Sequence, residues 1–542
     1  MSSNRIVKLA VVVMLVSVLA TTCIALPSSS GSSSLTPDGG VYEYKTEGIS
    51  AETYMATITG YTEGREDFLT IQTGIEGYPV KAIGPDAFRN SNSLKAVVIP
   101  EKVNSIGDYA FADCSSLEAA YFIGEMPSMG KGVFDNTASG FTIYCLNEVW
   151  SGYNDYKTAV WSPYEYSDST GGRYSYYILN DEITIFRYIS GENISIPSFI
   201  ENNGKRYPVV SIGPESFYKC SVKTVTIADG IERIGDRAFS WEHDKGSPLR
   251  SAIFPDTLDS IGDEAFRNCK SLVSVDLPKS LRYIGFEAFR DSSLKSIYIP
   301  NSVNYVGGGA FYCCYDLKSA KLSQSMIKIP ERMFGYCELL TFIEIPDRIT
   351  SVGASAFYKT GLKSLDFNEV KTIEREAFYD CTNLRFIDAD EVRVIDNEAF
   401  YGCTSLKSID FDEIESIGYR SFGKCTSLDY VVFSESLRNL DEDSFRGCTS
   451  LSGAYFEGPM PVIGDNAFKN ADNDFKVHYL KYYSASWSGF NTYNSAVWDG
   501  SSPSSNSGID NSLMILIAAI AVTVVLVVSI AILFKKKKGR SP

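Results

Sequence analysis

A short motif recurs at nearly constant spacing along most of this chain. The motif is Ile-Gly-x-x-Ala-Phe, sometimes with a conservative exchange, and most copies begin 21 to 23 residues after the previous one. A lone unit of this length cannot bury its apolar face, so the copies must stack on one another. The period therefore predicts a solenoid. The phenylalanines of the motif are Phe88, Phe111, Phe134, Phe217, Phe239, Phe266, Phe289, Phe311, Phe334, Phe357, Phe378, Phe400, Phe422, Phe445 and Phe468.

Each unit also carries a strand pattern after the motif. In residues 261–278 the motif leads into Leu-x-x-Val-x-Leu, with Leu272, Val275 and Leu277 at the apolar positions. Because side chains of a strand alternate between its two faces, the apolar pair points inward and the residues between point outward. We expect a mainly β repeat solenoid of the leucine-rich-repeat type. Each coil contributes one short parallel strand, and a transmembrane helix follows at the C-terminus.

The whole arrangement occurs twice. Residues 120–127 and 454–461 are closely similar, as are the Trp- and Tyr-rich segments that follow each of them. We predict a short module at residues 41–166 and a long module at 174–499, each with a cap at both ends. Caps are needed because an open solenoid end exposes apolar core and unpaired strand edges. The aromatic ends are expected to plug the solenoid, although stacking on sugars is an alternative.

The two ends of the chain predict its topology. Residues 1–25 combine Arg5 and Lys8 with an apolar run, which is typical of a secretory signal peptide, and a Ser/Gly-rich linker follows at 26–40. A second Ser-rich tether at 500–512 leads into 22 apolar residues at 513–534, long enough to span a bilayer. The lysine-rich tail at 535–542 is expected in the cytoplasm. We predict a single-pass cell-membrane protein whose N-terminal ectodomain is extracellular.

The charge of the chain argues against several functions. Lys and Arg number 50 against 66 Asp and Glu, and the region between the two ends carries a net charge of −23. Such a surface repels phosphate backbones, so we expect no nucleic-acid partner. Only His243 and His478 are present, and the common motifs of hydrolases, zinc proteases and nucleotide-binding enzymes do not occur. We therefore predict no catalytic residues, no cofactor and no enzymatic activity.

Most of the twelve cysteines occupy one position of the repeat. Nine of them follow the repeat Phe by three residues, and the sequence contains no Cys-x-x-Cys. Position-locked recurrence predicts a buried ladder of free thiols that act as small apolar groups. Some pairing into disulfides is the alternative, because adjacent coils lie about 4.8 Å apart, within the Cα separation that a disulfide accepts.

The outward position between the two inner strand residues forms a second column. In successive units of the long module it is occupied by Asp276, Tyr298, Lys321, Glu344, Asp366, Asp388, Asp410, Val432 and Tyr455. Four successive carboxylates, Glu344 to Asp410, repel one another and need compensating cations. We weigh two interpretations: a solvated stripe neutralised by Lys363, Arg385 and Lys407, or an acidic stripe that faces a ligand or binds Ca²⁺.

Aromatic residues lie beside this stripe. Phe342, Phe386 and Tyr430 occupy the neighbouring outward position, and Tyr298 and Tyr455 belong to the column itself. Aromatic and charged side chains together are typical of binding surfaces. These five residues are our candidates for ligand binding, and packing along the strand edges is the alternative.

The consensus Ile-Gly-x-x-Ala-Phe-x-x-Cys-x-x-Leu-x-x-Val-x-Ile-Pro resembles the BspA-type leucine-rich repeat family of surface proteins. It is nearly complete in residues 106–122 and 306–322, whereas Ile373-Glu374 and Ile395-Asp396 lack the Gly. The resemblance implies an adhesin-like scaffold that attaches to a protein or glycan on another cell or on the matrix. A structural spacer without a specific ligand is the alternative, and a glycan-active enzyme would require two carboxylates in one pocket.

Overall fold

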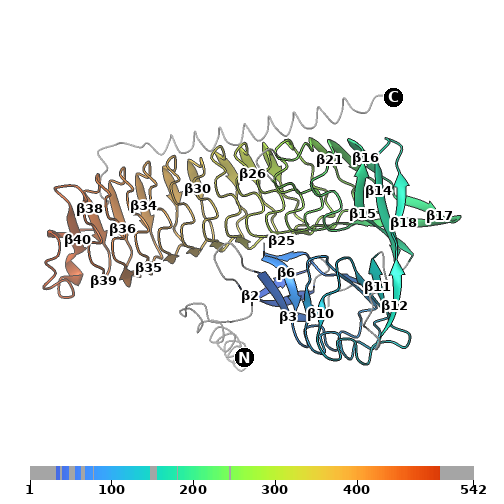
Figure 1. Ribbon diagram of the computed structural model, residues 1–542. Coiled ribbons are helices and arrows are strands. Elements are labelled where there is room, and N and C mark those ends of the chain that lie inside the picture. The colour runs from blue at the N-terminus through green and yellow to red at the C-terminus, as the bar shows by residue number, and fades with distance from the viewer. Residues whose placement is uncertain are drawn as a thin grey trace, which may run out of the picture.

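The computed structural model describes residues 32–36, 40–47, 55–62, 68–76, 78–146, 156–179, 181–242 and 246–500. These residues form two stacks of coils, a short module followed by a long one (Figure 1). The segments predicted as signal peptide (1–25), membrane span (513–534) and basic tail (535–542) lie outside the described residues, as does the tether apart from Gly500. Within the described ranges, no helix has the length and apolar character that a membrane crossing requires.

Most coils contribute two strands, which corrects the prediction of one strand per coil. The first follows the repeat Leu, as expected, and we call its side of the solenoid the long-strand face. The second is usually the two-residue strand just before the motif Gly, on what we call the short-strand face. There Ile234 pairs in parallel with Ile212 of the preceding coil and Ile261 of the next. The apolar residue before the Gly thus stacks as the strand residues do.

On the long-strand face the strands run parallel from coil to coil. In the short module they are β4 (Phe68–Thr70), β7 (Ala96–Ile99), β9 (Ala119–Phe122), β11 (Thr142–Leu146) and β12 (Lys157–Trp161). In the long module they are β16 (Asn193–Ile196), β19 (Thr224–Ile227), β21 (Ser251–Ile253), β24 (Ser296–Tyr298), β26 (Ser319–Lys321), β28 (Phe342–Glu344), β30 (Ser364–Asp366), β32 (Phe386–Asp388), β34 (Ser408–Phe411), β36 (Tyr430–Phe433), β38 (Gly453–Phe456), β40 (Lys476–Leu480) and β41 (Ser495–Trp498).

The short-strand face is built in the same way. Its strands in the short module are β6 (Tyr78–Ile83), β8 (Ser105–Ile106) and β10 (Ser128–Met129). In the long module they are β18 (Lys205–Ile212), β20 (Arg233–Ile234), β22 (Ser260–Ile261), β23 (Tyr283–Ile284), β25 (Tyr305–Val306), β27 (Lys328–Ile329), β29 (Ser351–Val352), β31 (Thr372–Ile373), β33 (Val394–Ile395), β35 (Ser416–Ile417), β37 (Asn439–Leu440) and β39 (Val462–Ile463).

Each module begins with antiparallel strands that cover its first coil. They are β1 (Ser32–Leu35), β2 (Val41–Glu47) and β3 (Met55–Thr62) in the short module, and β13 (Tyr164–Ser167), β14 (Arg173–Leu179) and β15 (Glu182–Ser190) in the long one. The first cap therefore includes part of the stretch that we predict as a linker. Two further antiparallel strands, β5 (Gly74–Ile75) and β17 (Phe199–Asn202), pair with β6 and β18. A 3-10 turn, η1 (Lys481–Tyr483), lies between β40 and β41.

The repeat phenylalanines form one continuous ladder inside each module. Neighbouring rings are stacked with centroids 4.7–5.8 Å apart and interplanar angles of 3–19°. All of these side chains are buried. The backbone follows the same spacing, since Phe378 N–H donates to the carbonyl of Ala399 in the next coil at 2.7 Å.

Tyrosines end both ladders in the same way. In the last coils the Phe N–H groups of Phe134 and Phe468 have no further coil to bind, and they donate instead to the hydroxyls of Tyr156 (3.2 Å) and Tyr493 (3.1 Å). Both tyrosines also meet the last Phe ring edge-on. A single side chain thus covers the last ring and satisfies the last donor, so these tyrosines serve as caps.

The ladder cysteines of the long module are free thiols. Seven of their eight Sγ atoms donate a hydrogen bond to the Phe carbonyl of the preceding coil, at 2.9–3.4 Å: Cys269, Cys314, Cys337, Cys381, Cys403, Cys425 and Cys448. Two further coils hold Ser292 or Thr360 at this position, which also bear a small donor, whereas Glu242 and Ala471 follow Phe239 and Phe468. In most coils of the long module the position therefore holds a small side chain able to donate a hydrogen bond.

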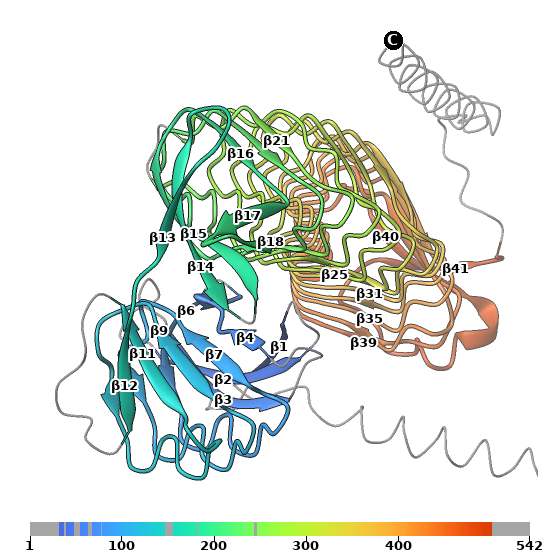
Figure 2. The ribbon, with the colours of Figure 1, turned by 90° about the vertical axis from the view of Figure 1, so that its right-hand side faces the viewer.

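The short module folds back against the first coils of the long module (Figures 1 and 2). An aromatic cluster of Trp161, Tyr177 and Phe186 joins them at the connection, where the Trp161 ring lies 5.4 Å from Tyr121 in the short module and 4.9 Å from Tyr177 in the long one. Lys102 Nζ also reaches Glu215 Oε1 at 2.9 Å. The modules are thus in direct contact beyond the segment that connects them.

Replacing one ladder phenylalanine is expected to destabilise the long module strongly. Phe378→Ala removes a buried ring stacked on both sides, which should lower the free energy of unfolding by about 3–5 kcal/mol. Phe342→Ala is the matched control, because that ring is 40% exposed and its loss should cost far less. Chemical denaturation followed by far-ultraviolet circular dichroism measures both, and equal effects would contradict the ladder.

The ladder thiols should not react in the folded protein. Burial raises the pKa of Cys381 to about 11, so almost no thiolate exists at pH 8. We expect maleimide to label the eight thiols only after denaturation, with Thr382→Cys, an exposed neighbour, labelled at once. Mass spectrometry measures the labels; rapid native labelling, or a mass that shows disulfides, would refute the assignment.

Candidate functional site

The outward column of the long-strand face is in register, as the sequence predicts. Tyr298, Lys321 and Glu344 are direct partners across β24, β26 and β28. Asp366 pairs with Asp388 across β30 and β32. Further along, Asp410 pairs with Val432, which pairs with Tyr455. The strand ladder is interrupted between β28 and β30 and between β32 and β34, so the column consists of three separate groups.

Exposed apolar side chains lie within and beside the first part of the column, which also holds Asp276 and Lys321. Tyr298 is 51% exposed on β24 and Phe342 is 40% exposed on β28. Sequence analysis missed two neighbours on the same face, Ile253 (56%) at the end of β21 and Val273 (43%) in the next coil. Ile253 occupies the column position one coil before Asp276. The same repeat position in the preceding unit of the sequence therefore identifies it. Together they place four large apolar side chains on five successive coils.

A salt bridge separates this apolar part from the acidic part. Lys321 Nζ lies 2.6 Å from Glu344 Oε1, and both side chains are partly exposed. Glu344 is therefore neutralised by its partner in the preceding coil. The pair leaves the acidic stripe shorter than the sequence suggests.

Asp366 and Asp388 form an adjacent pair of acids on this face. No ion pair joins either of them to Lys363 or Arg385, the bases that one interpretation assigned to them. The pKa of Asp366 is raised by partial burial, then by the carboxylates of Asp388 and Asp347. Repulsion between these groups is thus present in the structure, and a positively charged partner would relieve it.

The Ca²⁺ alternative depends on the side chains of the acidic stripe. The side chain of Asp410 lies outside the described residues. Among the side chains that are described, no group of three or more His, Cys, Asp or Glu residues is placed to hold a metal ion.

The candidates nearer the C-terminal end pack against one another. Tyr455 stacks on His478 at 4.4 Å and meets Trp498 edge-on at 5.2 Å. Tyr430 is half-buried and lies edge-on to Tyr455 at 6.4 Å, and Phe386 is also half-buried. Burial and Lys476 lower the pKa of His478, so it is neutral at physiological pH. For Tyr430 and Tyr455 the packing along the strand edges that we weighed as an alternative is present.

A second row of tyrosines follows the repeat phenylalanines. The rings of Tyr358, Tyr379 and Tyr401 stack at centroid distances of 5.0 Å. Recurrent Phe-Tyr dipeptides mark this row in the sequence, although we did not single them out. Because neighbouring rings cover each other's faces, the row presents ring edges and hydroxyls to solvent. It does not offer the open faces on which sugar rings stack.

The match to a known family agrees with this geometry. A family model described as "BspA type Leucine rich repeat region (6 copies)" matches residues 74–151, 184–244, 243–363 and 350–474, well over half of the chain. The chain belongs to the BspA-type leucine-rich repeat family. No curated protein matches this BspA-type protein.

Several solved structures are similar to this BspA-type protein. A leucine-rich repeat protein from Bacteroides ovatus is 26% identical, with 62% of this chain and all of that chain covered and a TM-score of 0.43. A T. pallidum leucine-rich repeat protein is 28% identical over 39% of this chain and 87% of its own, with a TM-score of 0.32. A leucine rich cell surface protein from Faecalibacterium prausnitzii is 21% identical over 80% and 96%, with a TM-score of 0.28.

Proposed function

We propose that this protein recognises another protein through the long-strand face of its long module. The observation that carries the proposal is the gathering of Ile253, Val273, Tyr298 and Phe342 on five successive coils of one face. Exposed apolar side chains grouped in this way favour an interaction site, whereas single ones are normal on any surface. Membership of a repeat family in which stacked coils create extended surfaces supports the same function.

The character of the face favours a protein partner over a glycan. Tyr298 and Phe342 stand on a parallel strand ladder, and unneutralised Asp366 and Asp388 lie further along it. Aromatic anchors beside charge match the composition of protein–protein interfaces. We infer that the partner carries an apolar patch and a basic patch. The separation of these patches should match the separation between the apolar residues and the Asp366–Asp388 pair on this face.

The position of the protein in the cell follows from its terminal segments. Our proposal places both modules outside the cell, held by the apolar segment 513–534, with the basic tail 535–542 inside. Many copies on one membrane would bind a second surface with avidity, which makes adhesion the biological role that we propose. The proposal assigns no catalysis to the repeats.

Removing the two aromatic anchors should abolish most of the affinity. The double variant Tyr298→Ala, Phe342→Ala in the full chain is expected to bind its partner on the order of 1000-fold more weakly, since each of the two anchors contributes about 2 kcal/mol. Binding to arrays of purified matrix and cell-surface proteins and to glycan arrays, with and without calcium, measures the effect.

The matched control removes exposed apolar groups elsewhere on the same solenoid. Ile327→Ala, Val394→Ala alters two exposed side chains beside and within the short-strand face and should leave binding unchanged. Equal losses in both double variants would refute the face that we assign. Binding to glycans alone would refute a protein partner, and no binding on any array would favour a structural spacer.

The topology is tested independently of the ligand. On intact cells that express the full chain, an antibody to the long module should bind, whereas a peptide tag placed after Pro542 should become accessible only after permeabilisation. The positive-inside rule is the reason for this expectation. A tag accessible on intact cells would contradict the proposed orientation.

A further inference from the structure

The contact between the two modules contains a hydrogen bond from backbone to carboxylate. Thr73, between β4 and β5 of the short module, donates its N–H to Asp236 Oδ2 in the long module at 2.9 Å. Asp236 follows β20, and Asp263 occupies the same position one coil later, after β22. The turn around Thr73 thus rests on two successive turns of the long module.

Asp236 and Asp263 are buried carboxylates that lie one above the other. Their exposed fractions are 4% and 5%. Asp236 Oδ1 accepts from Asp263 N–H at 3.0 Å, and Asp263 Oδ1 accepts from Phe286 N–H at 2.8 Å. Burial raises the pKa of Asp236 to about 6, and burial and the neighbouring Asp236 hold the pKa of Asp263 well above its ordinary value.

The same repeat position shows what this residue does elsewhere. Asp108 Oδ1 accepts from Lys131 N–H at 2.8 Å, and Asn397 Oδ1 accepts from Tyr419 N–H at 2.8 Å. Both are exposed. The position therefore bridges one coil to the next, with either a charged or a neutral side chain. At Asp236 and Asp263 the short module also packs against the residues that form this bridge.

The short module also brings two buried polar oxygens to this contact. Gln72 Oε1 and Thr73 Oγ1 are buried without a hydrogen-bond partner. Gln72 and Asp236 line the same cavity of about 80 Å³, and Thr73 lines a neighbouring one with Asp236 and Asp263. An ionised carboxylate only accepts hydrogen bonds, whereas a protonated one supplies an O–H donor. The carbonyl oxygen of Gln72 can only accept and therefore favours the protonated form, whereas the Thr73 hydroxyl can also donate and favours neither form.

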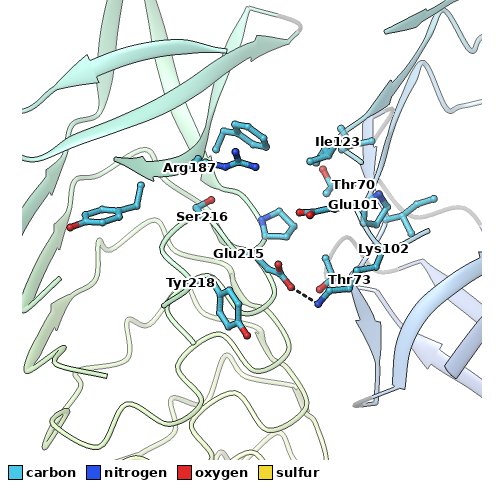
Figure 3. Close-up of a pocket in the computed structure, with 15 residues that line it drawn as sticks. Thr70, Thr73, Glu101, Lys102, Ile123, Arg187, Glu215, Ser216 and Tyr218 are labelled. Carbon is cyan, nitrogen blue, oxygen red and sulfur yellow. Dashed lines mark hydrogen bonds and ion pairs between the residues drawn. The ribbon is translucent and has the colours of Figure 1, made fainter. Parts of the chain in front are cut away.

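Three of the bases around the two carboxyls are paired with other acids. The groups that face the carboxyls are the acids Glu76, Glu215 and Glu264, the phenol Tyr283, and the bases Lys81, Lys102, Arg233, Arg237 and Arg267. Lys102 and Arg237 both pair with Glu215 at 2.9 Å, and Arg267 pairs with Glu264 at 2.8 Å. Figure 3 shows the Lys102–Glu215 pair across the adjoining cavity of about 450 Å³. These three bases are thus bound to other carboxylates.

We propose that this contact is a pH-dependent clasp, in which the two modules dock tightly while the Asp236–Asp263 pair holds a proton and separate more readily once both carboxyls are ionised. The inference goes beyond the proposed function and does not depend on it. Docking sets the direction in which the long module extends from the short one, so the clasp couples the reach of the protein to pH.

The sign of the effect follows from proton binding. Burial under the short module raises the pKa of Asp236, so the docked state binds more protons than the open state. Docking is therefore tightest in acid and weakens as the pH rises through the raised pKa. Each unit by which docking raises the pKa of one carboxyl corresponds to about tenfold in the docking equilibrium.

Hydrogen exchange of the full chain in detergent micelles tests the clasp. The peptide at residues 68–76 contains Thr73, whose N–H is bonded only across the contact, and a core peptide at residues 372–381 serves as the internal reference. After correction for the intrinsic rates, protection of the first peptide should fall at least about tenfold from pH 4 to 7.5 relative to the second. A protection that is independent of pH would overturn the proposal.

Two variants and a control identify the groups responsible. Asp263→Asn keeps the oxygen that Phe286 needs and removes one charge, so protection at pH 7.5 should rise at least about tenfold. Asp236→Asn places an amide N–H₂ against an N–H of Thr73 or Asp263, and should lower protection at every pH. Asp108→Asn, the exposed equivalent, should behave as the unaltered protein. An undiminished pH dependence in Asp263→Asn would overturn the clasp even if the unaltered protein opens with pH.

Discussion

The stacking of one phenylalanine per coil is the interaction on which the rest of this structure depends. Rings about 5 Å apart require the backbone turns that carry them to follow one another at the same spacing, and this is the spacing of hydrogen-bonded strands. Both strand faces and the thiol ladder are therefore consequences of the same repeat distance. Each ladder needs a defined end, and Tyr156 and Tyr493 provide it with a ring and a hydroxyl.

A periodic core turns every outward position into a column, so a sequence with no recognisable catalytic motif can still build an extended surface of defined chemistry. Substitutions at such a position leave the core unchanged and alter only the surface. The column on the long-strand face changes from apolar at Tyr298, through the Lys321–Glu344 pair, to acidic at Asp366 and Asp388. A long partner surface would meet all three kinds of chemistry in order.

The contact between the modules departs from this regularity. Elsewhere in the repeat the side chain at this position bridges one coil to the next. Asp236 and Asp263 do the same and also support the short module. Burying two carboxyls one coil apart is costly when both are charged, and the cost depends on their protonation. The two buried carboxyls therefore weaken the contact when they are ionised at neutral pH, and their protonation makes the contact responsive to pH.

The amino-acid sequence by itself determined the repeat, the inward and outward residues, the two capped modules and the buried cysteine position. The repeat, its inward and outward residues and its cysteine position recur mostly every 21 to 23 residues, so each copy supports the interpretation of the next, and the modules are recognised because the whole arrangement occurs twice. The sequence did not predict the second strand of each coil, because a strand of two residues carries too little pattern. It also did not predict the left-handed turns at residues such as Glu264 (φ 53°), because the residue type there does not indicate a positive φ. Only the tertiary structure decided which charges meet and that Thr73 binds Asp236, 163 residues away. That contact joins two stacks, and no periodic signal in either stack records how the other lies against it.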